Sequence, residues 1–590
     1  ANGKDERIHI LQVRPLNSDK NETENDQLIF KSLESSIEKF KKLQKNKSNV
    51  VGKSAIFGVM PDWNPAEIIG TKPHILAFDL YRFLITDEVW ARQRAEYGYK
   101  DVRPQSLLVS FSGHPYVDVR ASFNSFIPST INNDLASRLV DFYIERLCEN
   151  PHYHDKVEFE ILPTCYAFNF EDWRLTLESG GFSSNEVVEL EDSLKTVTKN
   201  AFSRIKDDFN SVDIFKERFE SIYFSDSNPL DKAISLLEDC RNYGTLAFAH
   251  LARSGFISIS LLKTAVETNI ISQAAMDSFL NSVETVAQDF LNDANKVANN
   301  KMPWSVYIEL YGHLRPGTYD ITSEAYSENI EKFMKPVVEQ SKNNSNVSIE
   351  NNIEWLNERE SFLEELSKIG ISEDIDSVEQ FMKDAIEGRE YAKFIFSRNL
   401  SAALDLITKY GKNHGLNREQ MANISLNSLF KLRSKNINSD DVFTFLINEI
   451  NTNKKIYEET NKIELPPLIT SESDFISFKY PNSQPNYIGF NRVSAETLIM
   501  DSKRFNKDKL NLKGKILLIP QADPGYDWIF GHNIAGLITM YGGGNSHMAI
   551  RANEFGLPAA IGVGEAMYKS LCRAAIIDLD VANRKIEIIR

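Results

Sequence analysis

The sequence predicts a multidomain α+β protein, with a largely helical central domain that contains some β-structure and a smaller α/β domain at the C-terminal end. Three observations support this prediction. The chain has 590 residues, which is too long for a single hydrophobic core. From about residue 175 to residue 460, apolar residues recur with the 3.6-residue period of a helix. After residue 470 the pattern changes to short β-runs separated by glycine turns, as in KGKILLIPQ and IAGLITMYGGG.

Composition limits the class of protein. Apolar residues make up 42% and charged residues 25% of the chain, which is typical of a globular protein. The net charge of -16 argues against a nucleic-acid partner held by phosphate contacts. No apolar run is long enough to cross a bilayer, so no membrane partner is expected. The four cysteines are widely spaced, without zinc or disulfide patterns, which favours a reducing cytoplasm; they are Cys148, Cys165, Cys240 and Cys572.

The first 450 residues divide into three predicted parts. Residues 1–16 end in the short β-run RIHILQVRPL, and residues 17–50 are Lys/Glu-rich with the spacing of one exposed helix, a linker helix. Residues 51–450 form the predicted central domain, in which SLLVSFSG and KVEFEILPTCYAF resemble strands before the helical region begins. The clearest helix follows Ser377 and Gln380, which have the spacing of a capping box.

A charged stretch followed by prolines marks the predicted boundary before the last domain. Residues 451–470 include Pro466 and Pro467, and we predict that they form a linker that acts as a hinge. Residues 471–590 then form the predicted C-terminal α/β domain.

Within this last domain, GGGNSHMAIRANEFG reads as a tight turn followed by a helix that ends at Gly556. Free backbone N–H groups at a helix start, approached by glycines, form an anion site. His547 lies in the first turn, and Arg551 lies four residues later on nearly the same face. A histidine beside a phosphate-sized pocket can accept a phosphoryl group on a ring nitrogen. The alternative is a histidine that caps a structural turn.

The longer string GGGNSHMAIRANEFGLPAAIGVG closely resembles the phosphohistidine motif of the swivelling domain in PEP synthases, pyruvate phosphate dikinases and rifampin phosphotransferases. The positions that match are Gly543, Gly544, Ser546, Ala549, Arg551, Glu554, Gly556 and Pro558. The resemblance implies that His547 carries a phosphoryl group between two distant active sites. It also implies that Gly543, Gly544, Ser546 and Arg551 bind the phosphate.

The N-terminal string ILQVRPL is similar to the closing strand of this family's ATP-grasp domain. The resemblance implies that Gln12 helps to hold a metal and that Arg14 contacts the nucleotide phosphates. ATP and Mg²⁺ would be bound mostly by a part of the ATP-grasp domain that precedes residue 1. The sequence is therefore expected to be a fragment, or the partner of a separate ATP-binding piece, and inactive toward ATP alone. The expected donor chemistry moves the β-phosphate of ATP and gives AMP and phosphate.

The 43 residues after His547 cannot contain the PEP-binding barrel of PEP synthase. The acceptor is therefore expected in the central domain, as in rifampin phosphotransferases and in the L-glutamine kinases that begin capsule phosphoramidate synthesis. The polar string GHLRPGTYD favours a small polar acceptor, such as the amide of L-glutamine. The alternatives are a PEP synthase-like or rifampin phosphotransferase-like enzyme with another acceptor, or a phosphocarrier module that acts on a protein.

Two central strings supply candidate acceptor-binding residues. HPYVDVRASFN contains His114, Asp118, Arg120 and Asn124, and alternation along a strand would place Asp118 and Arg120 on one face.

The second string, GHLRPGTYD, contains His313, Arg315 and Tyr319 beside glycines that permit close approach. We expect the two strings to line one pocket, in which the arginines neutralise the phosphoryl group and His313 orients or deprotonates the acceptor. The alternative is that these residues form buried ion pairs between strands and helices.

Overall fold

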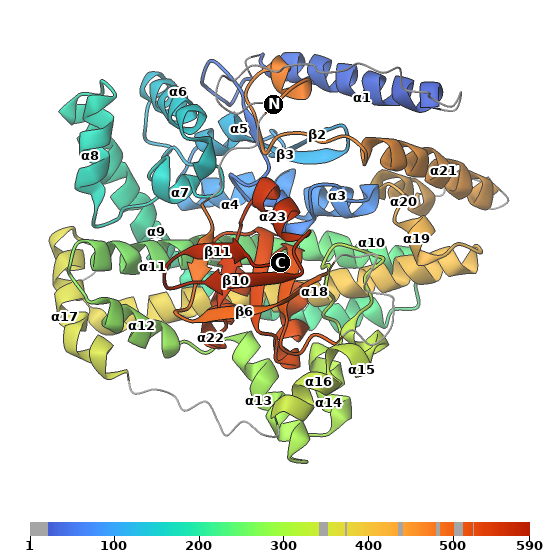
Figure 1. Cartoon of the computed structure of the whole chain (residues 1–590). Coiled ribbons are helices and arrows are strands. Elements are labelled where there is room, and N and C mark those ends of the chain that lie inside the picture. The colour runs from blue at the N-terminus through green and yellow to red at the C-terminus, as the bar shows by residue number, and fades with distance from the viewer. Residues whose placement is uncertain are drawn as a thin grey trace.

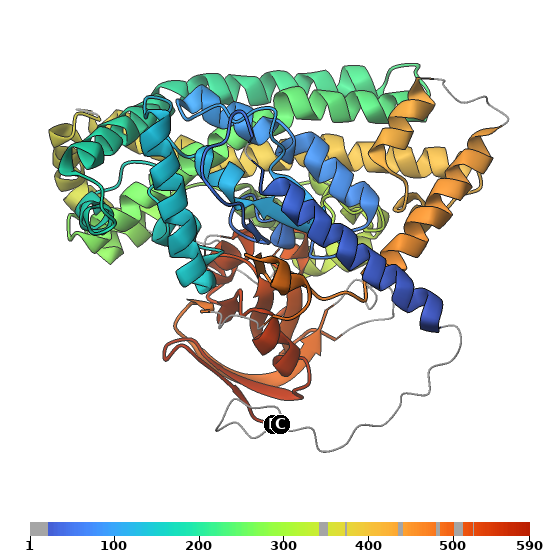
Figure 2. The ribbon, with the colours of Figure 1, turned by 90° about the horizontal axis from the view of Figure 1, so that it is seen from above.

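The computed structural model describes residues 22–45, 47–341, 352–371, 374–434, 441–478, 484–500, 511–522, 524–544 and 546–590. Long helices form an extended layer, and a C-terminal sheet domain packs against one side of this layer (Figures 1 and 2). The predicted multidomain α+β class is confirmed.

The start and the end of the central region meet in a small antiparallel sheet with strand order β2-β3-β1-β4. Its strands are β1 (Phe57–Gly58), β2 (Leu108–Phe111), β3 (His114–Asp118) and β4 (Leu468–Ile469). Helix α1 (Glu22–Leu43) precedes the sheet and packs on it through buried Phe40, which contacts Phe57 at 5.7 Å between ring centroids. The helix predicted in residues 17–50 is therefore present, with one face buried.

The helices before residue 225 surround this sheet and continue into the long helical layer. They are α2 (Pro65–Ile68), α3 (Ile75–Tyr81), α4 (Val89–Tyr97), α5 (Val119–Asn124), α6 (Asn133–Glu149), α7 (Val157–Glu160), α8 (Phe170–Ser179) and α9 (Ser184–Tyr223).

The helices of the second half complete the layer. They are α10 (Pro229–Asp239), α11 (Thr245–Glu267), α12 (Gln273–Asn281), α13 (Val286–Ala298), α14 (Trp304–Tyr311), α15 (Ile330–Phe333), α16 (Lys335–Ser341), α17 (Ile353–Lys368), α18 (Ile375–Asn413), α19 (Arg418–Met421), α20 (Leu426–Arg433) and α21 (Val442–Thr460). Helices α10 and α11 follow each other end to end, joined by the π-helical segment Cys240–Gly244, and α18 runs alongside both in the centre of the largest apolar core (Figure 1).

One stretch of the described chain, Pro229–Glu267, is long and apolar enough to span a membrane by length and composition. Within its most apolar window, 78% of the residues are buried inside the protein. This stretch is one continuous helix, formed by α10, the π-helical segment Cys240–Gly244 and α11, and it lies in the protein core.

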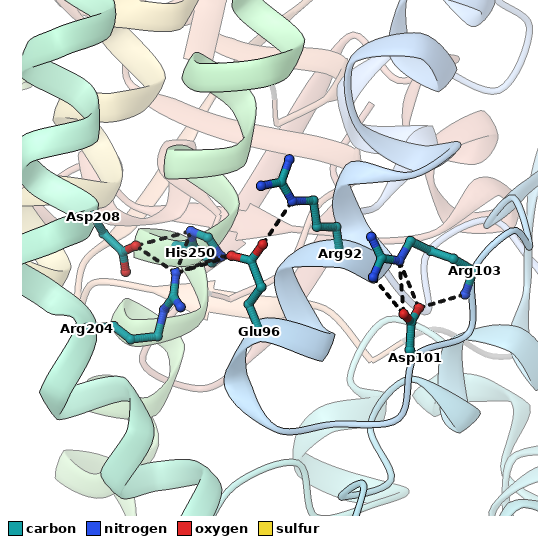
Figure 3. A network of polar contacts seen from close by, with 7 residues as sticks. All are labelled: Arg92, Glu96, Asp101, Arg103, Arg204, Asp208 and His250. Atoms are coloured by element: carbon teal, nitrogen blue, oxygen red, sulfur yellow. Dashed lines mark hydrogen bonds and ion pairs between the residues drawn. The ribbon is translucent and has the colours of Figure 1, made fainter.

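A polar network joins three of these helices (Figure 3). His250 of α11 lies 3.0 Å from Glu96 of α4 and 3.1 Å from Asp208 of α9. Arg204 contacts both carboxylates, at 3.4 Å and 3.2 Å. The hydrogen bond from His250 lowers the pKa of Glu96 to about 2, so this carboxyl stays ionised over the whole physiological range.

Three local predictions were wrong. KVEFEILPTCYAF contains the short helix α7 and no strand within it. Helix α18 begins at Ile375, with Asp374 as its N-cap, and the side chain of Asp374 accepts the backbone N–H of Ser377 at 3.3 Å. The helix therefore starts before the predicted capping box. Strand β3 ends at Asp118, so Arg120 lies on helix α5 and does not alternate with Asp118 along a strand.

The C-terminal domain contains a seven-stranded sheet of order β11-β10-β6-β7-β8-β9-β5, in which β6, β7, β8 and β9 are parallel. Its elements are β5 (Asn486–Ile488), β6 (Arg492–Ile499), β7 (Ile516–Gln521), β8 (Gly536–Tyr541), α22 (His547–Glu554), β9 (Ala559–Ile561), α23 (Glu565–Leu571), β10 (Ile576–Asp580) and β11 (Lys585–Ile588). The β-runs predicted from KGKILLIPQ onward are all strands.

An apolar core joins this domain to helices α13–α16. The ring of Phe333 lies 5.7 Å from Trp528, which belongs to the 3₁₀ segment Pro524–His532 that follows β7. A side chain at Gly531 would come within 2.8 Å of Val337, so the backbones of the two parts approach closely. This contact packs the segment between β7 and β8 against α15 and α16 of the central region.

Candidate functional site

The glycine turn joins the end of β8 to helix α22. Gly542 has φ +144°, a conformation that L residues rarely adopt, and Ser546 caps the helix by accepting the N–H of Ala549 at 3.3 Å. His547 is the first helical residue, as predicted. Its side chain and Asn545 lie outside the described residues. At the other end Gly556 has φ +58°, and the helix stops there.

The turn lies at the carboxyl ends of parallel strands, where loops from neighbouring strands meet. This position agrees with the general location of ligand sites in parallel sheets. A Cβ atom at Gly543 would meet no atom within 4 Å, whereas one at Gly544 would lie 3.1 Å from Oδ1 of Asn486.

The glycine turn contacts helix α2 of the central region. Glu67 is 7% exposed, and its carboxylate accepts a hydrogen bond from the backbone N–H of Gly543. Burial raises the pKa of Glu67, and the positive charges of Lys393 and Arg389 on α18 oppose that rise. Neither Lys393 nor Arg389 makes a hydrogen bond or an ion pair with any described residue. Two cations whose donors no described residue occupies therefore lie close to Glu67, which contacts the glycine turn.

A cavity lies next to these cations, between α13, α14 and α18. It encloses about 750 Å³, the open space at its mouth included. Apolar and aromatic side chains form part of its wall: Val286, Ala287, Phe290, Tyr311, Leu314, Tyr326 and Phe394. Polar side chains form the rest: His313, Arg315, Thr318, Glu390, Lys393, Ser397 and Asp527. Lys393 thus belongs both to the cavity wall and to the surroundings of Glu67.

Asp527 comes from the C-terminal domain and pairs with Arg551 of α22, with Nε and Oδ1 3.7 Å apart. Arg551 is only 2% exposed and lies beside the stacked rings of Phe530 and Phe555, whose centroids are 5.7 Å and 4.9 Å from its guanidinium carbon. Arg551, predicted to bind phosphate, is therefore placed in the interior of its domain, and Asp527 connects it to the cavity.

His313 and Arg315 both line the cavity. Burial lowers the pKa of His313 to about 4, so its imidazole is neutral near pH 7 and is a weak base. Its Nε2 lies 3.2 Å from the carbonyl oxygen of Phe394.

The guanidinium of Arg315 donates to Asp405 at 2.8 Å and to the hydroxyl of Ser401 at 2.9 Å. Arg315 is therefore held in a hydrogen-bonded position in the wall.

Tyr319 is buried outside the cavity wall, with its ring 5.1 Å from that of Tyr81 in an edge-to-face arrangement. It therefore supports the loop that carries His313 and Arg315 from behind.

The HPYVDVRASFN residues do not line this cavity. Arg120 donates to the carbonyl oxygens of Leu43 and Lys45 at the end of α1, at 2.9 Å and 3.1 Å. Asp118 caps α5 and pairs with Lys47 at 2.9 Å. The structure therefore brings the two predicted strings to different places.

The other two residues of that string also bond to neighbouring backbone. The amide of Asn124 donates to the carbonyl oxygen of Val51 at 2.8 Å. His114 lies 3.0 Å from the carbonyl oxygen of Ile463, and burial lowers its pKa to about 4. In the same region Tyr116 donates to the carbonyl oxygen of Pro466 at 2.6 Å. The predicted hinge, residues 451–470, is thus bonded to the small sheet, and its role as a hinge stays a prediction.

Gln12 and Arg14 lie outside the described residues. Within the described ranges no group of three or more His, Cys, Asp or Glu side chains is arranged to hold a metal ion. The proposed nucleotide and metal contacts stay predictions.

Sequence reasoning missed Glu67, Arg389, Lys393 and Asp527. The string GREYAKF offered one signal, because Arg389 and Lys393 are spaced i and i+4 on a helix whose neighbouring positions are apolar. Nothing in the sequence shows that Glu67 lies beside them.

Comparison with curated proteins gives relatives at low identity. The chain is 24% identical over 304 residues to a rifampicin phosphotransferase of Bacillus cereus, which is 50% of this chain and 32% of that protein. It is 29% identical over 121 residues to a rifampicin phosphotransferase of Bacillus subtilis, which is 20% of this chain and 14% of that protein. The chain therefore covers about a third or less of each relative's length.

The family comparison falls on the part of the chain that contains the glycine turn. It supports the predicted PEP-utilising family at the level of this domain. The L-glutamine kinase subtype and the ATP-grasp portion stay predictions. Residues 511–583, which include β7, β8, α22 and β9, match the family described as PEP-utilising enzyme, mobile domain.

Proposed function

We propose that this chain is the acceptor-binding and phosphocarrier part of a phosphotransferase in which His547 passes a phosphoryl group to an acceptor in the cavity beside α18. The observation that carries the proposal is the position of the glycine turn. It contacts Glu67 close to Lys393, and Lys393 also lines the cavity. A phosphoryl group on the first residue of α22 would have a short path to a bound acceptor.

The chemistry requires positive charge around the moving group, because the transition state spreads negative charge over the phosphoryl oxygens. Lys393 and Arg389 supply it, with donors that no described residue occupies. In the transfer, the bond from phosphorus to the imidazole nitrogen breaks and a bond from phosphorus to the acceptor atom forms. The electron pair of the broken bond stays on the ring nitrogen, and the proton that the acceptor loses is taken up by this nitrogen, which leaves a neutral imidazole.

The donor side follows from the resemblance. An ATP-grasp portion, with ATP and Mg²⁺, would phosphorylate His547 from the β-phosphate, and Gln12 and Arg14 would belong to that site. The C-terminal domain would then move between the two sites, since transfer needs contact at near bonding distance.

Two acceptors are considered. A small polar acceptor, such as the amide of L-glutamine, fits the polar half of the wall with Arg315, Glu390 and Asp527. The aromatic half, with Phe290, Tyr311 and other rings, favours an acceptor that also has an apolar body, as does the similarity to rifampicin phosphotransferases. A protein acceptor is less favoured, because a phosphocarrier module needs no cavity of this size.

The test separates the two half-reactions. His547 is phosphorylated directly with phosphoramidate, the reagent is removed, and L-glutamine or rifampicin is added in parallel reactions followed by ³¹P NMR. We expect an acid-labile phosphate on the peptide that contains His547, none in His547→Ala, and transfer to one of the two acceptors. Retained transfer in His547→Ala would refute the phosphocarrier role.

A further inference from the structure

Glu67 occupies an unusual backbone setting. Helix α2 starts after Trp63 and Asn64, which both have positive φ, +49° and +29°. Such conformations cost free energy for residues other than glycine and persist only when the surroundings enforce them. Here Asp62 is held by a bidentate ion pair to Arg94, with both bonds at 2.8 Å and both side chains buried. The turn is thus fixed on one side and presents Glu67 on the other.

The carboxylate of Glu67 has partners from two parts of the protein. On its own turn, Asn64 donates to Oε2 at 3.3 Å. From the C-terminal domain, Gly543 donates its backbone N–H. The charged or titratable groups that act on Glu67 are Lys393 and Arg389 of α18, together with Tyr81 of α3.

The end of the α2 segment also lies beside strand β7. A Cβ atom at Gly70, at the end of the α2 segment, would lie 3.1 Å from Oε1 of Gln521 at the end of β7. Contact between α2 and the C-terminal domain therefore extends from Gly543 to the neighbouring strand. Since a buried carboxylate is costly without donors, loss of the Gly543 N–H would leave Glu67 with the hydrogen bond from Asn64.

We propose that Glu67 is a positioning residue for the second half-reaction: its ionised carboxylate receives the N–H of Gly543 and so docks the start of α22 beside Lys393 and Arg389. The role rests on the proposed function, because it orients the residue that would carry the phosphoryl group. Burial raises the pKa of Glu67, and the hydrogen bond from Gly543 opposes that rise, so this hydrogen bond is stronger when the carboxyl group is ionised.

The first test measures the contact without any acceptor. Hydrogen exchange followed by mass spectrometry reports on the peptide that contains residues 542–546 in the 590-residue chain. We expect protection in the wild type and exchange about ten to a hundred times faster in Glu67→Ala, the scale for losing a hydrogen bond to a charged group. Glu67→Asp should restore part of the protection. Asp239→Asn removes a buried carboxylate of α10 that pairs with Arg218, and should leave this peptide unchanged.

The second test uses protein that has been phosphorylated with phosphoramidate. We expect Glu67→Ala and Glu67→Gln to be loaded as fast as the wild type but to discharge to L-glutamine or rifampicin about tenfold to a hundredfold more slowly. The wild-type discharge rate should rise with pH through an inflection above 4.5, and Glu67→Gln should lack that inflection.

The outcomes distinguish the two proposals. Failure of the wild type to load His547, or to discharge to either acceptor, would refute the proposed function, and the exchange experiment would still decide the role of Glu67. Unchanged exchange in Glu67→Ala, or a wild-type peptide without protection, would overturn the docking role. Wild-type discharge rates in both Glu67 variants would overturn it as well.

Discussion

Replacing Gly542 by alanine should destabilise the C-terminal domain by about 2–6 kcal/mol. Two terms contribute. The backbone at Gly542 has φ +144°, and an L residue there costs on the order of 1–3 kcal/mol. The added methyl group would lie 2.6 Å from the Cβ of Ala522 and 2.9 Å from Cγ2 of Ile561, inside the packed end of the sheet. Overpacking of this kind costs about 1–3 kcal/mol.

The adjacent Gly543 is the matched control, because a Cβ atom there meets nothing within 4 Å. Gly543→Ala should change the free energy of unfolding by less than about 1 kcal/mol. The assay is urea unfolding, with hydrogen exchange of peptides from β7 and β8 as a local readout. Equal stability of Gly542→Ala and Gly543→Ala would refute the reasoning, since it would mean that the turn has no packed inner side.

Three further predictions concern the site and its surroundings. Arg389→Ala and Lys393→Ala should each slow discharge of phospho-His547 by about a hundredfold or more while loading is unaffected, which ³¹P NMR of pre-loaded protein would show. Arg120→Met should lower the free energy of unfolding by about 3 kcal/mol, because carbonyl oxygens at the end of α1 lose a charged donor. Urea unfolding measures this loss. Slower discharge of phospho-His547 without a loss of stability would contradict the structural role of Arg120. The pKa of Glu96 is lowered in the folded protein, so its contribution to stability is present above pH 4.5 and is lost as the pH falls toward about 2. When urea midpoints are plotted against pH over this range, the slope should be smaller for Glu96→Gln than for the wild type.

The sequence predicted the C-terminal domain well, because its signals are local. Short apolar runs such as ILLIP and GLITM, bounded by turn residues, favour buried strands, and the glycines and Ser546 mark the turn and helix start between β8 and β9. The same local reasoning failed in the central region. VEFEIL alternates like a strand, yet it folds as α7, with Val157 buried and Phe159 partly exposed. Packing against neighbouring helices outweighs a short alternating pattern.

The position of Arg120 could not be predicted for a similar reason. The alternation in YVDVR continues past the end of β3, but Asp118 caps a helix there and turns Arg120 toward the end of α1. Glu67 and Lys393 are separated by more than three hundred residues, and only tertiary structure brings them together. In contrast, His313 and Arg315 of GHLRPGTYD could be predicted as binding residues from the sequence, because glycine and proline mark a loop, where binding residues concentrate.

The pairing of β1 with β4 has a consequence for how the protein is made. Phe57 pairs with Ile469, so the small sheet receives its last strand only after the whole helical region has been synthesised. At about 5–20 residues per second, that delay is on the order of 20–80 s. During this time Gly58 and its neighbours expose an unpaired strand edge on the nascent chain, of the kind that promotes aggregation. A nascent chain arrested before residue 468 should therefore depend on chaperones, and one arrested well beyond residue 469 should not.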